Sequence, residues 1–102
     1  MSPHKYTVKI LSIAEDDLAE IITYIAEDRL SAAEKFADKI EKRLARLADH
    51  PALGRIPGEE ELARLGYRYL VIDNYLVFYT VDEQTVLIHR IIHGARDYVS
   101  LL

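Results

Sequence analysis

The sequence predicts an α+β domain in which an N-terminal strand, an antiparallel two-helix hairpin and a three-stranded antiparallel meander build one small mixed sheet. Three observations predict this fold. A stretch at residues 5–11 alternates between apolar and polar side chains, two stretches of helical periodicity follow between residues 12 and 50, and three β-rich runs fill residues 67–92. Alternation with a period of two indicates a strand, whereas spacings of three and four indicate a helix. Because two short amphipathic helices cannot bury both of their apolar stripes on each other, we expect them to pack on one face of the sheet.

The length and composition are those of one globular domain that spans residues 1–102. Half of the residues are apolar and 29% are charged, a balance typical of folded domains. There is no cysteine, and no apolar run approaches the roughly 20 residues of a membrane span. The N-terminus enters a strand pattern almost at once and does not resemble a signal peptide, so we expect a cytoplasmic protein. The net charge of −4 argues against a domain whose main activity is to bind the phosphate backbone of nucleic acid.

Both helices are predicted to begin at a serine. Ser12 and Ser31 are each followed three residues later by a glutamate, which is the capping-box pattern of a helix N-terminus. The first helix is expected to run to about Asp28, and the second to end before His50-Pro51, because the residue before a proline avoids the helical conformation. A link of only two or three residues between the helices predicts that they fold back on each other. The apolar stripe of the first helix consists of Leu18, Ile21, Ile22 and Ile25.

Residues 50–66 are predicted to form a loop, because prolines and glycines interrupt every regular pattern there. We expect at most a short helical turn at residues 60–65. Leu53 and Ile56 are the apolar side chains expected to anchor the loop on the core. A connection of this length in so small a domain is often functional.

The strands of the meander are predicted at residues 67–72, 75–81 and 85–92. Asp73-Asn74 separates the first two strands and tolerates the left-handed backbone of a tight hairpin. We expect the face of the sheet opposite the helices to be concave and partly open, with polar side chains from the strands on it. Strict alternation in the last strand places Val86, Ile88, Arg90 and Ile92 on one side and Leu87, His89, Ile91 and His93 on the other.

The residues best suited to chemistry gather after the last strand, in the segment His93-Gly94-Ala95-Arg96-Asp97-Tyr98. Histidine titrates near neutral pH, arginine stabilises negative charge and tyrosine supplies a hydroxyl. The segment could therefore bind an anion or transfer a proton. The alternative is that Arg96 and Asp97 pair locally while Tyr98 packs against the domain, and the pattern does not decide between the two.

Two polar residues lie among apolar neighbours within the last strand. Arg90 is either a cation on the open face or a side chain whose stem covers apolar surface while its head reaches water. His89 fits a hydrogen-bonded histidine at the edge of the core better than an acid or base. His89 and His93 lie about 13 Å apart along a strand, so we expect no metal site. The sequence also lacks the motifs that bind phosphate or other cofactors, and we expect none.

Three segments in this order resemble the RelE/ParE superfamily of type II toxin–antitoxin toxins. They are Leu53-Gly54-Arg55 within the loop "HPALGRIP", the tyrosine-rich strand Tyr75–Val81, and Ile92-His93-Gly94-Ala95-Arg96-Asp97. The similarity covers nearly the whole chain, including the helical hairpin after a single strand. It implies a toxin that arrests growth. It also implies a cognate antitoxin, a separate chain that lays an extended or helical segment over the hairpin and the sheet in a hetero-oligomer.

The resemblance implies two functions of different kinds. RelE-like members are ribosome-dependent, metal-independent endonucleases that cleave mRNA in the decoding site. For that activity the similarity points to a catalytic set of Arg68, His93, Arg96 and Tyr98. ParE-like members lack such a set and poison DNA gyrase instead.

The ending of this chain resembles the ParE branch, so a gyrase inhibitor is the favoured prediction. Tyr75 stands where the ribonucleases tend to carry an arginine, and the terminal Ser100-Leu101-Leu102 offers no aromatic acid. The mRNA endonuclease, with the ribosome as partner, is the alternative, and an inactive relative that only binds antitoxin is a third. The predicted contacts with target or antitoxin are Arg55, Tyr75, Tyr79 and Arg90.

Overall fold

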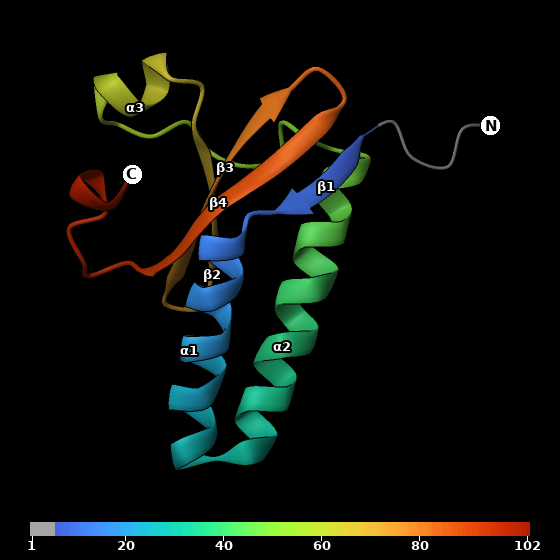
Figure 1. Cartoon of the computed structure of the whole chain (residues 1–102), viewed down its shortest axis with the longest axis vertical. Coiled ribbons are helices and arrows are strands. Elements are labelled where there is room, and N and C mark those ends of the chain that lie inside the picture. The colour runs from blue at the N-terminus through green and yellow to red at the C-terminus, as the bar shows by residue number, and fades with distance from the viewer. Residues whose placement is uncertain (1–5) are drawn as a thin grey trace.

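The computed structural model describes residues 6–102 and has the predicted α+β fold, built on one four-stranded sheet (Figure 1). The elements in chain order are β1 (Thr7–Ile10), α1 (Ser12–Asp28), α2 (Leu30–Ala45), the 3-10 turn η1 (Arg46–Ala48), α3 (Glu60–Arg64), β2 (Arg68–Ile72), β3 (Tyr75–Asp82), β4 (Thr85–His93) and the 3-10 turn η2 (Val99–Leu101). The strand order is β1-β4-β3-β2, with β1 parallel to β4 and the other pairs antiparallel. The predicted mixed sheet is thus confirmed. Of the strand predicted at residues 5–11, residue 5 lies outside the described residues.

The predicted serine caps are wrong for both helices. Leu11 is the N-cap of α1, and its carbonyl accepts the amides of Ala14 and Glu15 at 2.9 and 3.0 Å. The Leu11 amide meanwhile donates to the Ile88 carbonyl at 3.0 Å, so the same residue ends the β1–β4 pairing and starts the helix. A single extended residue, Arg29, joins the two helices and caps α2 through its own backbone. At α1 a backbone carbonyl therefore accepts the Glu15 amide that the Ser12 side chain was expected to accept, and neither helix has a side-chain cap hydrogen bond.

The main core lies between the helical hairpin and one face of the sheet. α2 contributes three buried side chains to it, Phe36, Ile40 and Leu44, whereas α1 contributes only one buried residue, Ala14. The apolar stripe of α1 packs against the core but stays partly exposed. The hairpin also extends beyond the sheet (Figure 1), where Tyr24 and Leu30 are 71% and 65% exposed. One flank of α1 is therefore left uncovered.

A β-bulge changes the predicted face pattern of β4. Tyr79 pairs with Ile88, but the next pair is Phe78 with Arg90, so His89 is an extra residue in β4. An inserted residue shifts the alternation of everything after it by one position. As a result Ile91 joins Ile88 in the main core, although strict alternation had put them on opposite sides.

The second face of the sheet is covered at its centre, so the prediction of an open concave face is wrong there. Phe78 is 1% exposed, and the rings of Tyr67, Tyr69 and Tyr98 surround it with centroids 6.5, 5.9 and 5.0 Å away. Leu62 of α3 is also buried. The loop and the C-terminal segment thus supply a second apolar layer that strand periodicity alone could not show.

The long loop is held by a buried tyrosine. Tyr79 is fully buried, its hydroxyl donates to the Pro51 carbonyl at 2.8 Å, and it accepts the Gly54 amide at 2.7 Å. The predicted anchors Leu53 and Ile56 are instead 39% and 61% exposed. The loop is therefore positioned by the hydrogen bonds of a buried tyrosine and not by the apolar side chains of Leu53 and Ile56.

Replacing Gly54 by alanine should destabilise the fold. An added Cβ would lie 2.6 Å from the Tyr79 hydroxyl oxygen and 2.9 Å from the Tyr69 carbonyl oxygen. Tyr79 is enclosed and cannot move away, so Gly54→Ala should lower the free energy of unfolding by about 2–3 kcal/mol in urea denaturation. Gly58→Ala is the matched control, because nothing lies within 4 Å of its added Cβ. Equal stability of the two variants would contradict the assignment of Tyr79 as the anchor.

The bulge residue His89 should make stability depend on pH. Its Nε2 lies 2.8 Å from Thr80 Oγ1, and burial lowers the pKa of His89 below 6.5. The unfolded chain then takes up a proton at this site at higher pH than the folded chain does. This contribution to stability is complete above about pH 6.5 and is lost as the pH falls through the folded pKa. The slope of unfolding free energy against pH should therefore be shallower for His89→Gln than for the unsubstituted chain, and identical slopes would refute the assignment.

Candidate functional site

Strand β4 is longer than its neighbour β1, which leaves part of its outer edge open. β1 pairs only with Thr85–Ile88 of β4. Beyond the bulge, the Gly94 amide donates to the Asn74 carbonyl. The backbone amide and carbonyl groups of the even-numbered residues of β4 therefore point toward β3. Backbone groups alternate in direction in an antiparallel pair, and those of Ile91 and His93 therefore point outward, toward α1.

Asp17 of α1 occupies the first position along this open edge. Its Oδ2 accepts the Ile91 amide at 3.0 Å and Arg90 Nε at 2.7 Å, and its Oδ1 accepts Arg90 Nη2 at 2.9 Å. Arg90 Nη1 in turn donates to the Leu101 carbonyl at 3.2 Å. The hydrogen bonds that Arg90 donates to the Asp17 carboxylate raise the pKa of Arg90. The pair thus ties α1, β4 and the C-terminal turn together.

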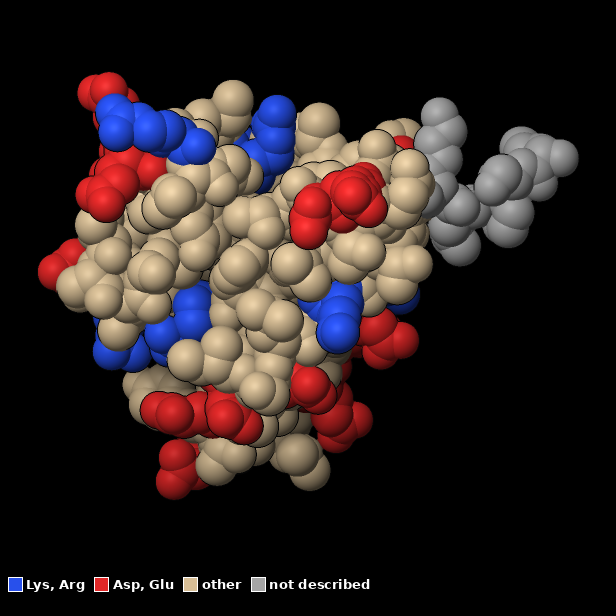
Figure 2. Space-filling model, turned by 45° about the horizontal axis from the view of Figure 1, so that its top comes forward, with Lys and Arg blue, Asp and Glu red and all other residues tan. Residues whose placement is uncertain are grey.

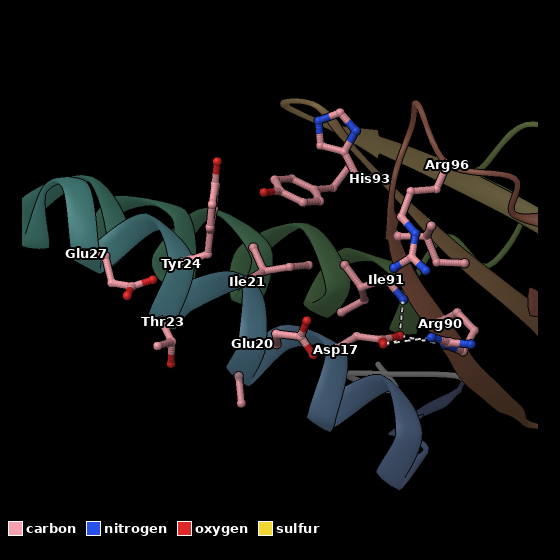
Figure 3. Close-up of a pocket in the computed structure, with 13 residues that line it drawn as sticks. Asp17, Glu20, Ile21, Thr23, Tyr24, Glu27, Arg90, Ile91, His93 and Arg96 are labelled. Carbon is pink, nitrogen blue, oxygen red and sulfur yellow. Dashed lines mark hydrogen bonds and ion pairs between the residues drawn. The ribbon is translucent and has the colours of Figure 1, made fainter.

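A groove of about 640 Å³ opens next to this ion pair, between α1 and the end of β4 (Figure 3). Glu20, Tyr24 and Glu27 lie on the helix side, and His93 and Arg96 lie across from them. The groove is lined by Asp17, Ala19, Glu20, Ile21, Thr23, Tyr24, Glu27, Tyr75, Arg90, Ile91, Ile92, His93 and Arg96. It therefore combines an acidic wall, a basic wall, aromatic side chains and a strand edge.

The structure brings together two of the four residues of the predicted catalytic set. His93 and Arg96 both line the groove. Arg68 is paired with Tyr79, four residues along β3 from the partner of His93, which is roughly 13 Å away in the strand direction. Arg68 Nη1 donates to the Gly54 carbonyl at 2.9 Å and holds the loop. Tyr98 lies on the second face, where its hydroxyl donates to Glu59 Oε2 at 2.7 Å.

The four predicted contact residues also lie in different places. Tyr75 lines the groove, and its ring packs edge-on against His93 with centroids 5.4 Å apart. Arg90 lines it as well, but its guanidinium is committed to Asp17. Tyr79 is buried, and burial raises its pKa. Arg55 forms a bridge to Tyr69 through its backbone, beside β2, and its side chain is exposed.

The residues on the helix side of the groove are not predicted from the sequence. In the sequence, Asp17 looks like an acidic residue that favours the N-terminus of a helix, and nothing in the pattern distinguishes Glu20 or Glu27 from other exposed acids. Tyr24 was the available signal, because an aromatic ring beside the apolar stripe of an amphipathic helix widens that stripe past the core. Within residues 6–102 no group of three or more acidic, histidine or cysteine side chains could hold a metal ion. None of the helices described is long and apolar enough to cross a membrane.

Removing the carboxylate of Asp17 should destabilise the chain strongly. Both partners of the pair are only 15% exposed, so Asp17→Ala leaves the Arg90 charge and the Ile91 amide unsatisfied. We expect a loss of about 3 kcal/mol in the free energy of unfolding, measured by urea denaturation. Asp38→Ala is the control, because its pair with Lys42 is exposed and should change stability by less than about 0.5 kcal/mol. Similar effects of the two substitutions would show that the buried pair does not hold these elements.

The fold defines a class of protein. A mixed four-stranded sheet with a helical hairpin on one face is the architecture of RelE/ParE-like toxins of type II toxin–antitoxin systems. A family profile described as the ParE toxin of the type II toxin–antitoxin system parDE matches residues 8–98. The chain therefore belongs to the ParE toxin family.

Solved structures agree with this family. A chain of a chromosomal ParDE toxin–antitoxin system from P. aeruginosa superposes with a TM-score of 0.72 at 21% identity, covering 88% of this chain and 97% of that one. A chain of the toxin–antitoxin complex RelBE2 from Mycobacterium tuberculosis has a TM-score of 0.58 at 28% identity, covering 93% of this chain and 98% of that one. No curated protein matches the sequence.

Proposed function

We propose that this ParE toxin arrests growth by inhibiting DNA gyrase in the cytoplasm, through protein contact and not through cleavage of RNA. The observation that carries the proposal is the dispersal of the residues that an RNA-cleaving site would need. General acid–base catalysis requires its groups within hydrogen-bond reach of one reacting centre. Arg68 and Tyr98 are instead bound to the loop, at the Gly54 carbonyl and the Glu59 carboxylate.

The distribution of charge supports the same proposal. On the face shown in Figure 2, basic side chains form separate small groups, with acidic or neutral surface between them. The net charge of the chain is −4. Entry into a site made of ribosomal RNA favours a continuous basic surface, because the phosphate backbone dominates such affinities. A protein target makes no such demand.

We also propose that a cognate antitoxin neutralises the toxin by occupying the groove between α1 and β4. The two ParE-like and RelE-like neighbours come from toxin–antitoxin systems, as their descriptions state. In this chain the groove offers the Ile91 carbonyl and the His93 amide, which have no hydrogen-bond partner within residues 6–102. Such an edge can accept an extended segment as an additional strand.

The proposed target can be tested with the purified chain and in cells. Gyrase should accumulate as cleaved DNA complexes, detected as linearised plasmid after protein denaturation, while mRNA in a purified translation system stays intact. Growth should stop on expression and resume when a cognate antitoxin is supplied. Arg96→Ala serves as the variant for the alternative, because an exposed side chain can be removed without loss of fold.

Three results would overturn the proposed target. Cuts in mRNA at ribosomal A-site codons that disappear in Arg96→Ala would identify the endonuclease instead, with His93 and Arg96 at its centre. Growth arrest with neither gyrase complexes nor cut mRNA would indicate another target. Normal growth at full expression would indicate an inactive relative.

A further inference from the structure

We propose that the groove between α1 and β4 selects its antitoxin segment by charge. It takes an extended segment with an acidic side chain against Arg96 and basic side chains against Glu20 and Glu27. This inference rests on the proposed docking of an antitoxin in the groove and adds the chemistry of that partner.

The strand edge alone holds a partner without distinguishing it from others. The Ile91 carbonyl and the His93 amide can form two backbone hydrogen bonds with any extended chain. Asp17 already occupies the Ile91 amide, so the pairing cannot extend further toward β1. Two backbone bonds carry no sequence information, and the choice of partner falls to the side chains around the edge.

The charges that remain available in the groove lie on opposite walls. Asp17 and Arg90 neutralise each other and are mostly buried. Glu20 and Glu27 are exposed on α1, Arg96 is exposed across from them, and none has an ion-pair partner within residues 6–102 (Figure 3). A partner that covers these charges with its own opposite charges is favoured, while one that places like charges there is rejected.

The spacing of the acidic wall fits an extended chain. Glu20 and Glu27 are seven residues apart on α1, which is about 10.5 Å along the helix axis. That length corresponds to about three residues of an extended segment. Side chains four positions apart project from the same side of an extended segment, about 13 Å apart, so two basic side chains at this spacing can reach both glutamates. Ile21 and the exposed ring of Tyr24 lie between these acids and offer an apolar contact for the position in between.

The test uses a displayed library of random 12-residue peptides selected on the full chain. Peptides that bind the unsubstituted chain should be enriched in a basic pair four positions apart together with one acidic residue. Peptides selected on Arg96→Glu should carry a basic residue in place of the acidic one. Peptides selected on the double variant Glu20→Lys with Glu27→Lys should carry two acidic residues in place of the basic pair. A peptide selected on the unsubstituted chain should bind each reversed variant at least about tenfold more weakly. Glu41→Lys, exposed on α2 and outside the groove, should leave both the selected charges and the affinity unchanged.

Hydrogen exchange of the His93 amide distinguishes a failure of charge selection from a failure of the docking site on which that selection rests. Selected peptides should protect that amide, which faces the groove, and its protection should follow the charge reversals. Peptides that protect His93 equally in all variants would overturn selection by charge and leave the docking site standing. Failure of any selected peptide to protect His93 would overturn both the docking and the inference built on it.

Discussion

The arrangement of this toxin depends on how one strand, β4, is satisfied along its outer edge. β1 covers the first half of that edge, and the chain then turns directly into α1 at Ser12. The turn brings Asp17 back to β4, where its carboxylate accepts the Ile91 amide in place of a further strand. The same carboxylate holds Arg90, whose far end holds the C-terminal turn. A single acidic side chain therefore closes the sheet, docks the helix and positions the tail.

This contact requires the bulge in β4. The inserted residue His89 resets the alternation, so that Ile91 enters the core while the Arg90 guanidinium reaches Asp17. Without the insertion, Ile91 and Ile88 would lie on opposite faces of the sheet. The bulge, the ion pair and the end of the strand pairing at Ile88 are thus one structural solution to the mismatch in length between β1 and β4.

Periodicity was sufficient to predict the elements and their order, because each strand and helix has its own repeat of apolar side chains. It could not predict the bulge, which depends on the register between β3 and β4 and not on either strand alone. The cap residues were missed for a related reason, since Leu11 serves the sheet and the helix at once. The cover over Phe78 includes the rings of Tyr67 and Tyr98, which are distant in sequence and carry no pattern that joins them.

The site was predicted on the strand side and missed on the helix side. Tyr75, His93 and Arg96 belong to a compact stretch of sequence, and the fold keeps them at one end of the sheet. Glu20 and Glu27 look like ordinary solvent-facing acids until α1 is placed beside an open strand edge. Arg68 is the opposite case, a predicted site residue that has a structural role. Similarity assigns it to a catalytic set, but its guanidinium donates to the Gly54 carbonyl.

A shared fold does not transfer an activity, because activity depends on the side chains placed on that fold. Catalysis requires several groups to converge on one atom, whereas a protein contact can use charges spread along a groove. The least exposed ion pair within residues 6–102, Asp17 with Arg90, holds the structure together and presents little net charge to a partner. The charges left unpaired along the groove, on Glu20, Glu27 and Arg96, are spread over two walls. Such a division of charge suits a surface that recognises another polypeptide better than a centre that holds a scissile phosphate.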